Sequence, residues 1–453
     1  MPTAADAPAA AEAPPSPDEA VGPTRARWGV LFAFSLLTAL NCMMWITFAP
    51  VRSQTARFYG VSGDLVDWLS MIFMALYPVV FAPMSWYIET GPVALQRGLR
   101  VSAAMNVVAA LLRYLSAAPR SFALLFAGQA LGSAAQGFTL GAPPRVAALW
   151  FDEREWGLAT GIGVTANQLG AVLAYFAAPL CVTGADGDGL PRLLGVELAL
   201  VGATGLAVWL GIPRAPSRPP SAVAARRDDE PARSLASYVL GVLEMLRSPT
   251  LLLLSLGYGL VVGVLYAFET LMTLLLPRAS TAQLGALGTA ALLAGLPGAV
   301  FGGWILDRTR RFKAANVGMS LAAAAALAAV AALSRRAMAS AFAPLVALVV
   351  ALGFLLCALL SSGFEWGVEL SFPISESTVA GVLNVFGQLG GIALIYGLEA
   401  YVRAPAECVA GNGLQAAALA LAAGLFALIR DEQKRQAALG QDGVGTPLMP
   451  AAR

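Results

Sequence analysis

Twelve runs of mostly apolar residues divide this chain, and they constrain its fold more than any other feature. An α-helix needs about 20 such residues to cross the hydrocarbon layer of a membrane. Of all residues 58% are hydrophobic and 12% are charged, and the charged share is about half that of a water-soluble domain. The sequence therefore predicts an all-α integral membrane protein with twelve transmembrane helices. The expected spans are residues 28–50, 65–88, 97–117, 121–143, 157–183, 190–213, 250–276, 282–306, 313–334, 340–363, 375–401 and 409–430.

A polar stretch separates these spans into two sets of six. It contains several prolines and a cluster of charges, and it finishes with apolar residues from Leu235 to Leu246 spaced as one face of a surface helix. The first 26 residues are rich in Ala and Pro, which is typical of a disordered tail. The expected organisation is a cytoplasmic tail at 1–26, a six-helix half at 27–213, a cytoplasmic linker with an amphipathic helix at 214–249, a second six-helix half at 250–430 and a cytoplasmic tail at 431–453.

Basic residues are distributed unequally over the two sides of the membrane. If the amino terminus is inside, 20 of the 29 Lys and Arg residues fall on the cytoplasmic side, eight fall outside and Arg113 lies within a span. Cytoplasmic loops of membrane proteins carry the excess of basic residues. Both termini are therefore expected to be cytoplasmic.

The two halves repeat each other in sequence. The triplet Gln-Leu-Gly at Gln168 returns at Gln388, and the segment 85–89 returns at 303–307 with nearly the same offset. Two parallel repeats of six spans are the architecture of the major facilitator superfamily, with the substrate site on the pseudo-twofold axis near the middle of the membrane. A buried amide is costly unless it is hydrogen-bonded. Gln168 and Gln388 are therefore expected to lie in that site.

Charged residues at the cytoplasmic ends of the spans are expected to form a gate. Residues 303–311 resemble the loop signature of the major facilitator superfamily, in which an aspartate holds a basic residue across the gate. Two glutamates lie four residues apart at the end of the tenth span, and an arginine lies at the equivalent end of the fourth. A salt bridge between these ends would break and re-form as the two halves move relative to each other. The expected gate residues are Asp307, Arg308, Glu365, Glu369 and Arg145.

Longer motifs resemble a narrower family. The chain reads FSLLTALNCMMWITFAPV at 34–51, YGVSGDLVDWLSMIFM at 59–74 and GFEWGVELSFPISESTVAG at 363–381. These strings are similar to those of the feline leukaemia virus subgroup C receptors, and the resemblance runs from about residue 27 to 397. It implies a transporter of the plasma membrane. Haem export has also been attributed to this family.

The resemblance also implies roles for particular residues. In the choline-transporting members, a tryptophan of the first span and a tyrosine of the seventh hold the quaternary ammonium group. The motifs place these residues at Trp45 and Tyr266, and they match the central glutamines of the family to Gln168 and Gln388.

The spacing of the two aromatic residues supports such a site independently. Trp45 and Tyr266 are 221 residues apart, so they are equivalent in the repeat and are expected to face each other across the axis. Two opposed rings attract a cation by about 2 kcal/mol or more once water is excluded. The alternative for Trp45 is a tryptophan anchored at the membrane interface.

Two further polar residues share helix faces with this pair. Asn41 precedes Trp45 by one turn, and it either orients the substrate or bonds a neighbouring helix. Glu269 follows Tyr266 by three residues, where the family has a small hydroxyl residue. An ionisable group within a span is a functional candidate, so Glu269 either reinforces cation binding or carries a proton. The alternative places Glu269 at the wetted outer mouth, paired with a residue such as Arg278.

These observations favour a transporter that moves choline or a related small amine by alternating access. A carrier of haem or another organic solute and a receptor that binds without transport remain alternatives. An enzyme is not expected, because the chain has no histidine, no Gly-x-Ser-x-Gly motif and no nucleotide-binding loop. The substrate is expected to be a small organic cation, and the other partner the lipid bilayer. No cofactor, metal or nucleic acid is expected, and the chain is expected to be a monomer.

Overall fold

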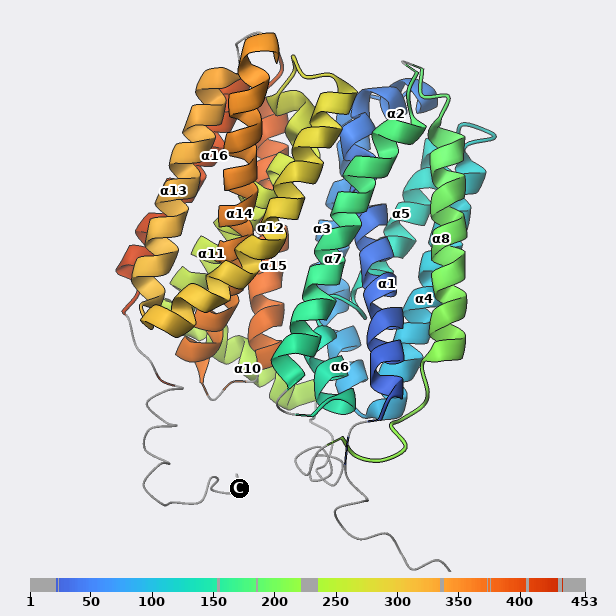
Figure 1. The fold of residues 1–453 in the computed structure, drawn as a ribbon, viewed down its shortest axis with the longest axis vertical. Coiled ribbons are helices and arrows are strands. Elements are labelled where there is room, and N and C mark those ends of the chain that lie inside the picture. Colours follow the sequence, from blue (N-terminus) through green and yellow to red (C-terminus); the bar gives the residue numbers. More distant parts are fainter. Residues whose placement is uncertain are drawn as a thin grey trace, which may run out of the picture.

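The chain forms one bundle of α-helices that run side by side (Figure 1). The computed structural model describes residues 22, 24–152, 155–184, 186–220, 235–334, 338–372, 374, 376–404, 407–430 and 434. The expected tails, at 1–26 and 431–453, lie almost entirely outside these residues, as does 221–234 of the expected linker.

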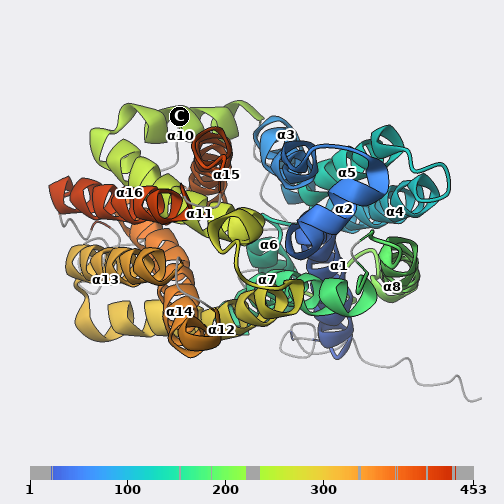
Figure 2. The ribbon, with the colours of Figure 1, turned by 90° about the horizontal axis from the view of Figure 1, so that it is seen from above.

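The helices form two groups that lie next to each other when the bundle is seen from above (Figure 2). The first group consists of α1 (Ala26–Ile46), the short helix η1 (Ala49–Val51), α2 (Arg52–Tyr59), α3 (Gly63–Glu89), α4 (Pro92–Ser116), α5 (Phe122–Gln136), α6 (Pro143–Trp150), α7 (Trp156–Cys181) and α8 (Leu190–Gly211). The second group consists of α10 (Leu235–Arg247), α11 (Pro249–Leu275), α12 (Thr281–Thr309), α13 (Phe312–Leu333), α14 (Met338–Ser371), α15 (Glu376–Tyr401) and α16 (Cys408–Leu428).

Serine side chains define where several spanning helices begin. Ser62, Ser121 and Ser248 accept a hydrogen bond from a backbone N–H in the first turn of α3, α5 and α11. Ser280 and Gln283 form a reciprocal capping box at the start of α12. The first N–H groups of a helix have no partner within it, so these side chains stabilise the ends at the expected turns.

Eleven helices among the described residues are long and apolar enough to cross a membrane. The expected span 121–143 differs from the others, because α5 is helical for only 15 residues and ends at Gln136, before α6 begins at Pro143. The segment 137–144 contains two glycines and two prolines, which interrupt the helix. Helix α5 packs against α3 and α4, so it occupies the position of the fourth spanning helix. Together with the eleven longer helices it makes up the predicted twelve, and the prediction is confirmed.

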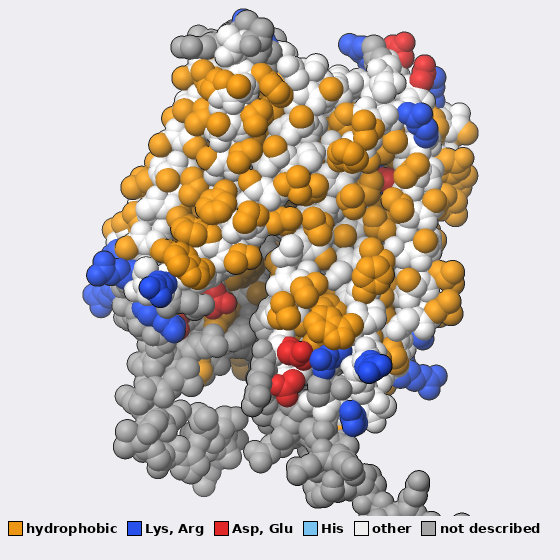
Figure 3. Space-filling model, viewed as in Figure 1, with side chains coloured by type: hydrophobic (Ala, Val, Ile, Leu, Met, Phe, Trp, Pro, Cys, Tyr) orange, Lys and Arg blue, Asp and Glu red, His pale blue; other side chains and the backbone are white. Residues whose placement is uncertain are grey.

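The surface matches a protein embedded in a membrane. In the face shown in Figure 3, apolar side chains cover the middle of the bundle, and charged side chains gather at its two ends. We call the end at which α1 begins and α16 finishes the terminal side, and the opposite end the far side. On the terminal side, the surface is hollowed between the two groups of helices.

The largest contacts between the two halves are made by three pairs of elements. Helix α7 packs against α12, α3 packs against α15, and α1 leads into η1, which packs against α11. The pairs α7–α12 and α3–α15 lie on opposite flanks of the bundle in Figure 2. The end of α1 and the second half of α11 therefore meet between them.

Helices α11 and α15 approach each other closely through glycines. A Cβ atom at Gly259 would lie 2.8 Å from the backbone oxygen of Phe386, and one at Gly263 would lie 2.6 Å from the carbonyl carbon of Gly390. Small residues of this kind let the backbones of membrane helices pack directly. The contact fixes the position of α11, which carries Tyr266 and Glu269.

The substitution Gly263→Leu should strongly reduce the yield of folded protein, because its side chain would overlap the backbone of α15. Overpacking a tight contact costs about 1–3 kcal/mol even where side chains can move, and here backbone atoms must move. Size-exclusion chromatography and thermal unfolding in detergent measure the effect. Gly424→Leu on α16 is the matched control, because nothing lies within 4 Å of its Cβ position. Equal yields of both variants would contradict this packing.

Candidate functional site

Trp45 and Tyr266 lie against each other where the two halves meet. Their ring centroids are 5.0 Å apart with an interplanar angle of 71°, an edge-to-face contact. Trp45 lies in the last turn of α1, and its indole N–H donates a hydrogen bond of 3.2 Å to the backbone oxygen of Ser70 on α3. Trp45 is buried and Tyr266 is half-buried. The structure thus brings together the two residues that the repeat pairs, and it places Trp45 inside the bundle.

The two repeated glutamines lie beside the aromatic pair. Gln388 on α15 is buried and lies beside the side chain of Tyr266. Gln168 on α7 is half-buried and lies beside the side chain of Cys357 on α14. One glutamine therefore adjoins the ring that faces Trp45, and the other bridges the two halves.

A glycine shapes the wall of this site. A Cβ atom at Gly391 would lie 2.8 Å from the sulfur of Met74 and 3.1 Å from Cδ2 of Tyr266. Gly391 follows the repeated Gln-Leu-Gly triplet directly. Its missing side chain therefore leaves room for the tyrosine ring and for Met74 from α3.

The end of α1 is held by polar groups from other helices. Helix α1 ends at Ile46, so its last carbonyl groups lack partners within the helix. The carbonyl oxygen of Met44 accepts hydrogen bonds from Arg113 (3.2 Å) and from Gln129 (2.9 Å). These contacts fix the backbone on either side of Trp45.

Arg113 is itself paired inside the first half. Its guanidinium nitrogen lies 2.9 Å from a carboxylate oxygen of Glu197 on α8, and both side chains are almost completely buried. Thr47 donates a hydrogen bond to the same carboxylate. Sequence reasoning noted Arg113 within a span but assigned it no partner. Because Arg113 and Glu197 each lie within an apolar span of the same half, the sequence could have indicated that they form an ion pair.

Asn41 does not lie with the aromatic pair. Its side-chain nitrogen donates hydrogen bonds of 2.8 Å to Asn106 on α4 and 2.9 Å to the backbone oxygen of Gly132 on α5. The side chain is completely buried within the first half. Of the two roles expected for Asn41, this geometry corresponds to the one in which it bonds neighbouring helices.

Glu269 is buried one turn beyond Tyr266 on α11. Only 5% of the residue is exposed, and its Oε1 atom has no hydrogen-bond partner among the described residues. It lines a small apolar cavity formed by α11, α12 and α14, together with Leu265, Phe268, Met272, Leu292, Leu352 and Cys357. This burial differs from the wetted outer position that one sequence-based alternative gave to Glu269.

The five expected gate residues lie toward the terminal side. Arg308 is exposed in the last turn of α12, and the side chain of Asp307 lies outside the described residues. On α14, Glu365 is exposed and Glu369 is buried, while Arg145 is half-buried near the start of α6. The predicted salt bridge between these ends stays a prediction.

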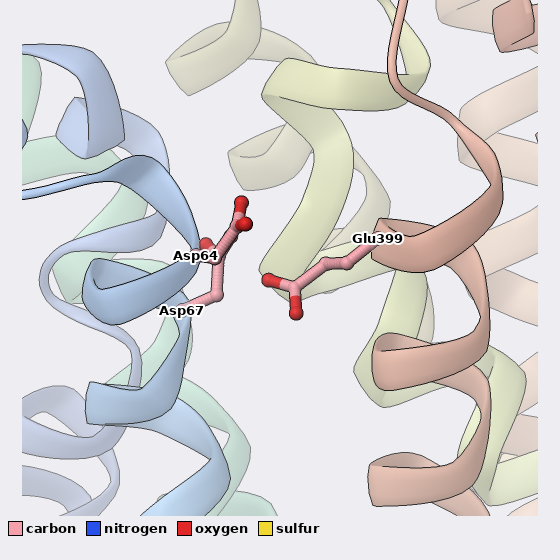
Figure 4. Close-up of side chains that lie close together, drawn as sticks. All are labelled: Asp64, Asp67 and Glu399. Atoms are coloured by element: carbon pink, nitrogen blue, oxygen red, sulfur yellow. The ribbon is translucent and has the colours of Figure 1, made fainter.

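A charged cluster that sequence reasoning did not find joins the halves on the far side. Arg52 on α2 contacts Asp64 at 3.2 Å and Asp67 at 2.6 Å, both on α3. Glu399 reaches toward them from α15, and carboxyl oxygens of Asp64, Asp67 and Glu399 lie within 4.8 Å of one another (Figure 4). The side-chain amide nitrogen of Gln54 adds a 2.8 Å hydrogen bond to Thr281 on α12. The far side of the bundle is therefore closed by polar contacts between the halves.

Comparison with known proteins identifies the class. Residues 34–394 match the family model described as Major Facilitator Superfamily, so the chain belongs to this superfamily of membrane transporters. The solved structure of a bacterial homolog of the human lysosomal transporter Spinster superposes with a TM-score of 0.62 at 17% identity, covering 90% of this chain and 98% of that one. The E. coli fucose:proton symporter FucP gives a TM-score of 0.57 at 14% identity, over 89% and 99%. At such identities the likeness shows the fold alone.

Curated relatives narrow the family. The chain is 32% identical to the choline/ethanolamine transporter flvcr2b of Danio rerio, over 91% of this chain and 85% of that protein. It is 31% identical to the uncharacterized MFS-type transporter C09D4.1 of Caenorhabditis elegans, over 91% and 71%, and 28% identical to human FLVCR2, over 92% and 79%. The chain belongs to the family of the feline leukaemia virus subgroup C receptors, as its motifs indicated.

Removing one partner of the buried ion pair should destabilise the protein strongly. Arg113→Met leaves Glu197 charged and unpaired, which typically costs about 3–5 kcal/mol of unfolding free energy. The double variant Arg113→Met/Glu197→Leu should recover most of that loss. Thermal unfolding in detergent measures both. Glu155→Gln is the control, because its ion pair with Arg27 (3.1 Å) is partly exposed and contributes little. An unchanged melting temperature for Arg113→Met would refute the expectation.

Proposed function

We propose that this transporter carries choline or a related small organic cation, and that Trp45 and Tyr266 bind its ammonium group. The observation that supports this proposal is the contact of the two rings at the junction of the halves. A quaternary ammonium group has no N–H to donate, so ring faces bind it better than hydrogen-bond acceptors do. Relatives of this chain are named choline/ethanolamine transporters.

The glutamines complete the site in this proposal. Gln388 already contacts Tyr266, and Gln168 lies on the opposite half. An amide offers both a donor and an acceptor, so it can bind the hydroxyl group at the other end of choline. Because the two rings touch, a cation binds between them only when the rings move apart. Substrate binding is thereby linked to a movement of α1 relative to α11, as alternating access requires.

We further propose that the terminal side is cytoplasmic, in a plasma membrane, and that the protein works as a monomer. The excess of Lys and Arg in the segments of that side supports the orientation. The hollow on the terminal side then opens toward the cytoplasm, and the Arg52 cluster closes the outer side. Asp307, Arg308, Arg145, Glu365 and Glu369 are the proposed inner gate.

Removal of either ring should raise the KM for choline. Trp45→Ala or Tyr266→Ala removes about 2 kcal/mol of cation binding, which corresponds to roughly thirtyfold. Tyr266→Phe keeps the ring and should retain most of the uptake. Radiolabelled choline uptake, normalised to protein at the cell surface, measures the effect.

The matched controls are Trp304→Ala and Tyr396→Ala, because both side chains are exposed on the outside of the bundle. Wild-type KM values in both ring variants would refute the aromatic site. If the wild type moves haem but neither choline nor ethanolamine, the proposed substrate class is wrong.

Gln388→Leu should separate choline from a cation without a hydroxyl group. The lost hydrogen bond is worth about 1 kcal/mol, so the inhibition constant of choline should rise roughly fivefold. Tetramethylammonium has no hydroxyl, so its inhibition constant should stay the same. Competition against a labelled substrate measures both. A parallel change for the two cations would show that Gln388 does not bind the hydroxyl.

A further inference from the structure

In the described part of the chain, the buried carboxyl group of Glu269 forms no ion pair. No base contributes to its electrostatic environment, and its Oε1 has no hydrogen-bond partner among the described residues. The side chains that line the adjacent cavity are apolar apart from a cysteine. An unpaired carboxylate in such surroundings is strongly unfavourable, so the group requires a positive charge or a proton.

Among the described residues, the titratable groups that face Glu269 come from four helices, and all are neutral at physiological pH. They are Cys42 on α1, Tyr175 on α7, Tyr266 on α11 and Cys357 on α14. Tyr175 also donates a hydrogen bond to the backbone oxygen of Glu269, which leaves the carboxyl group unaffected. The compensating charge must therefore arrive from solution.

The position of Glu269 brings it within reach of a bound substrate. It lies three residues after Tyr266, and positions i and i+3 share one face of a helix. Cys42, which faces Glu269 from α1, lies three residues before Trp45 in the same way. A cation between the two rings would be next to this carboxylate, and the attraction is strong where water is excluded.

We infer that Glu269 makes this protein an exchanger, in which one proton and one substrate cation compete for the same carboxylate. The inference rests on the proposed function, because it takes the cation to bind at Trp45 and Tyr266. When the cation binds, the carboxyl O–H bond breaks and the proton leaves to the solution on that side. After the cation is released on the other side, Glu269 takes a proton there, and the neutral carrier returns.

This cycle moves one positive charge in each direction. The net charge transferred is zero, so the membrane potential does not drive it. A pH gradient does drive it, and with one-for-one coupling each pH unit supports about a tenfold accumulation of the cation. Acid on the side of uptake should raise the KM for choline, because protons then occupy the carboxylate.

The purified full chain, reconstituted in liposomes, allows a direct test with radiolabelled choline. In the wild type, an acidic lumen should raise influx, and added choline should make the lumen more alkaline as reported by a trapped dye. An inside-negative potassium diffusion potential, set with valinomycin at equal pH, should leave influx unchanged. Wild-type influx that responds to the potential and ignores the pH gradient would overturn the inference.

Variants then assign the coupling to this residue. Glu269→Gln cannot ionise, so it should lose both the stimulation of influx by an acidic lumen and the alkaline shift of the lumen. Glu269→Asp should retain both. Glu244→Gln, on the exposed face of α10, is the matched control and should behave as the wild type. Persistence of both signals in Glu269→Gln would overturn the assignment. Absence of choline influx in the wild type under every condition would instead overturn the transport proposal, and this inference with it.

Discussion

The central constraint in this molecule is that polar groups buried within the bundle cannot hydrogen-bond to water. Helix α1 ends beside Trp45, and its last carbonyl groups need donors that only other helices can supply. Arg113 and Gln129 supply them, and Glu197 balances the charge of Arg113. The position of the tryptophan therefore depends on three helices, α4, α5 and α8, that do not carry the aromatic pair. The buried ion pair in this half stabilises a helix end, whereas the Oε1 atom of Glu269 has no hydrogen-bond partner in the described part of the chain.

The sequence repeat predicted more of the site than any single motif. Residues at equivalent places in parallel repeats are related by the axis between the halves, so Trp45 and Tyr266 were expected to meet, and they do. The same reasoning placed Gln168 and Gln388 near them, although the particular side chains that they adjoin were not expected. Apolar run length was sufficient for eleven of the spans, because hydrophobicity and helix length are coupled in a membrane.

The remaining features depend on contacts that no periodicity encodes. Arg52 and Glu399 belong to different halves and are not equivalent in the repeat, so only the closed arrangement of the far side brings them together. Asn41 shares a face with Trp45, but α1 is surrounded by helices of its own half at that level, and the amide bonds them. Helical spacing gives the direction of a side chain. It does not give the neighbour that the side chain will find.

The contact between Trp45 and Tyr266 has a consequence for insulation. Two rings packed edge to face leave no room between them for a file of water molecules or a bare ion, so the residues that we propose to bind the substrate also close the path between the halves. A pore needs a passage that stays open, whereas a carrier needs one that closes on itself. If the proposed site is right, one pair of side chains sets both the selectivity for the substrate and the resistance to ion leakage, so a substitution that alters one property also alters the other.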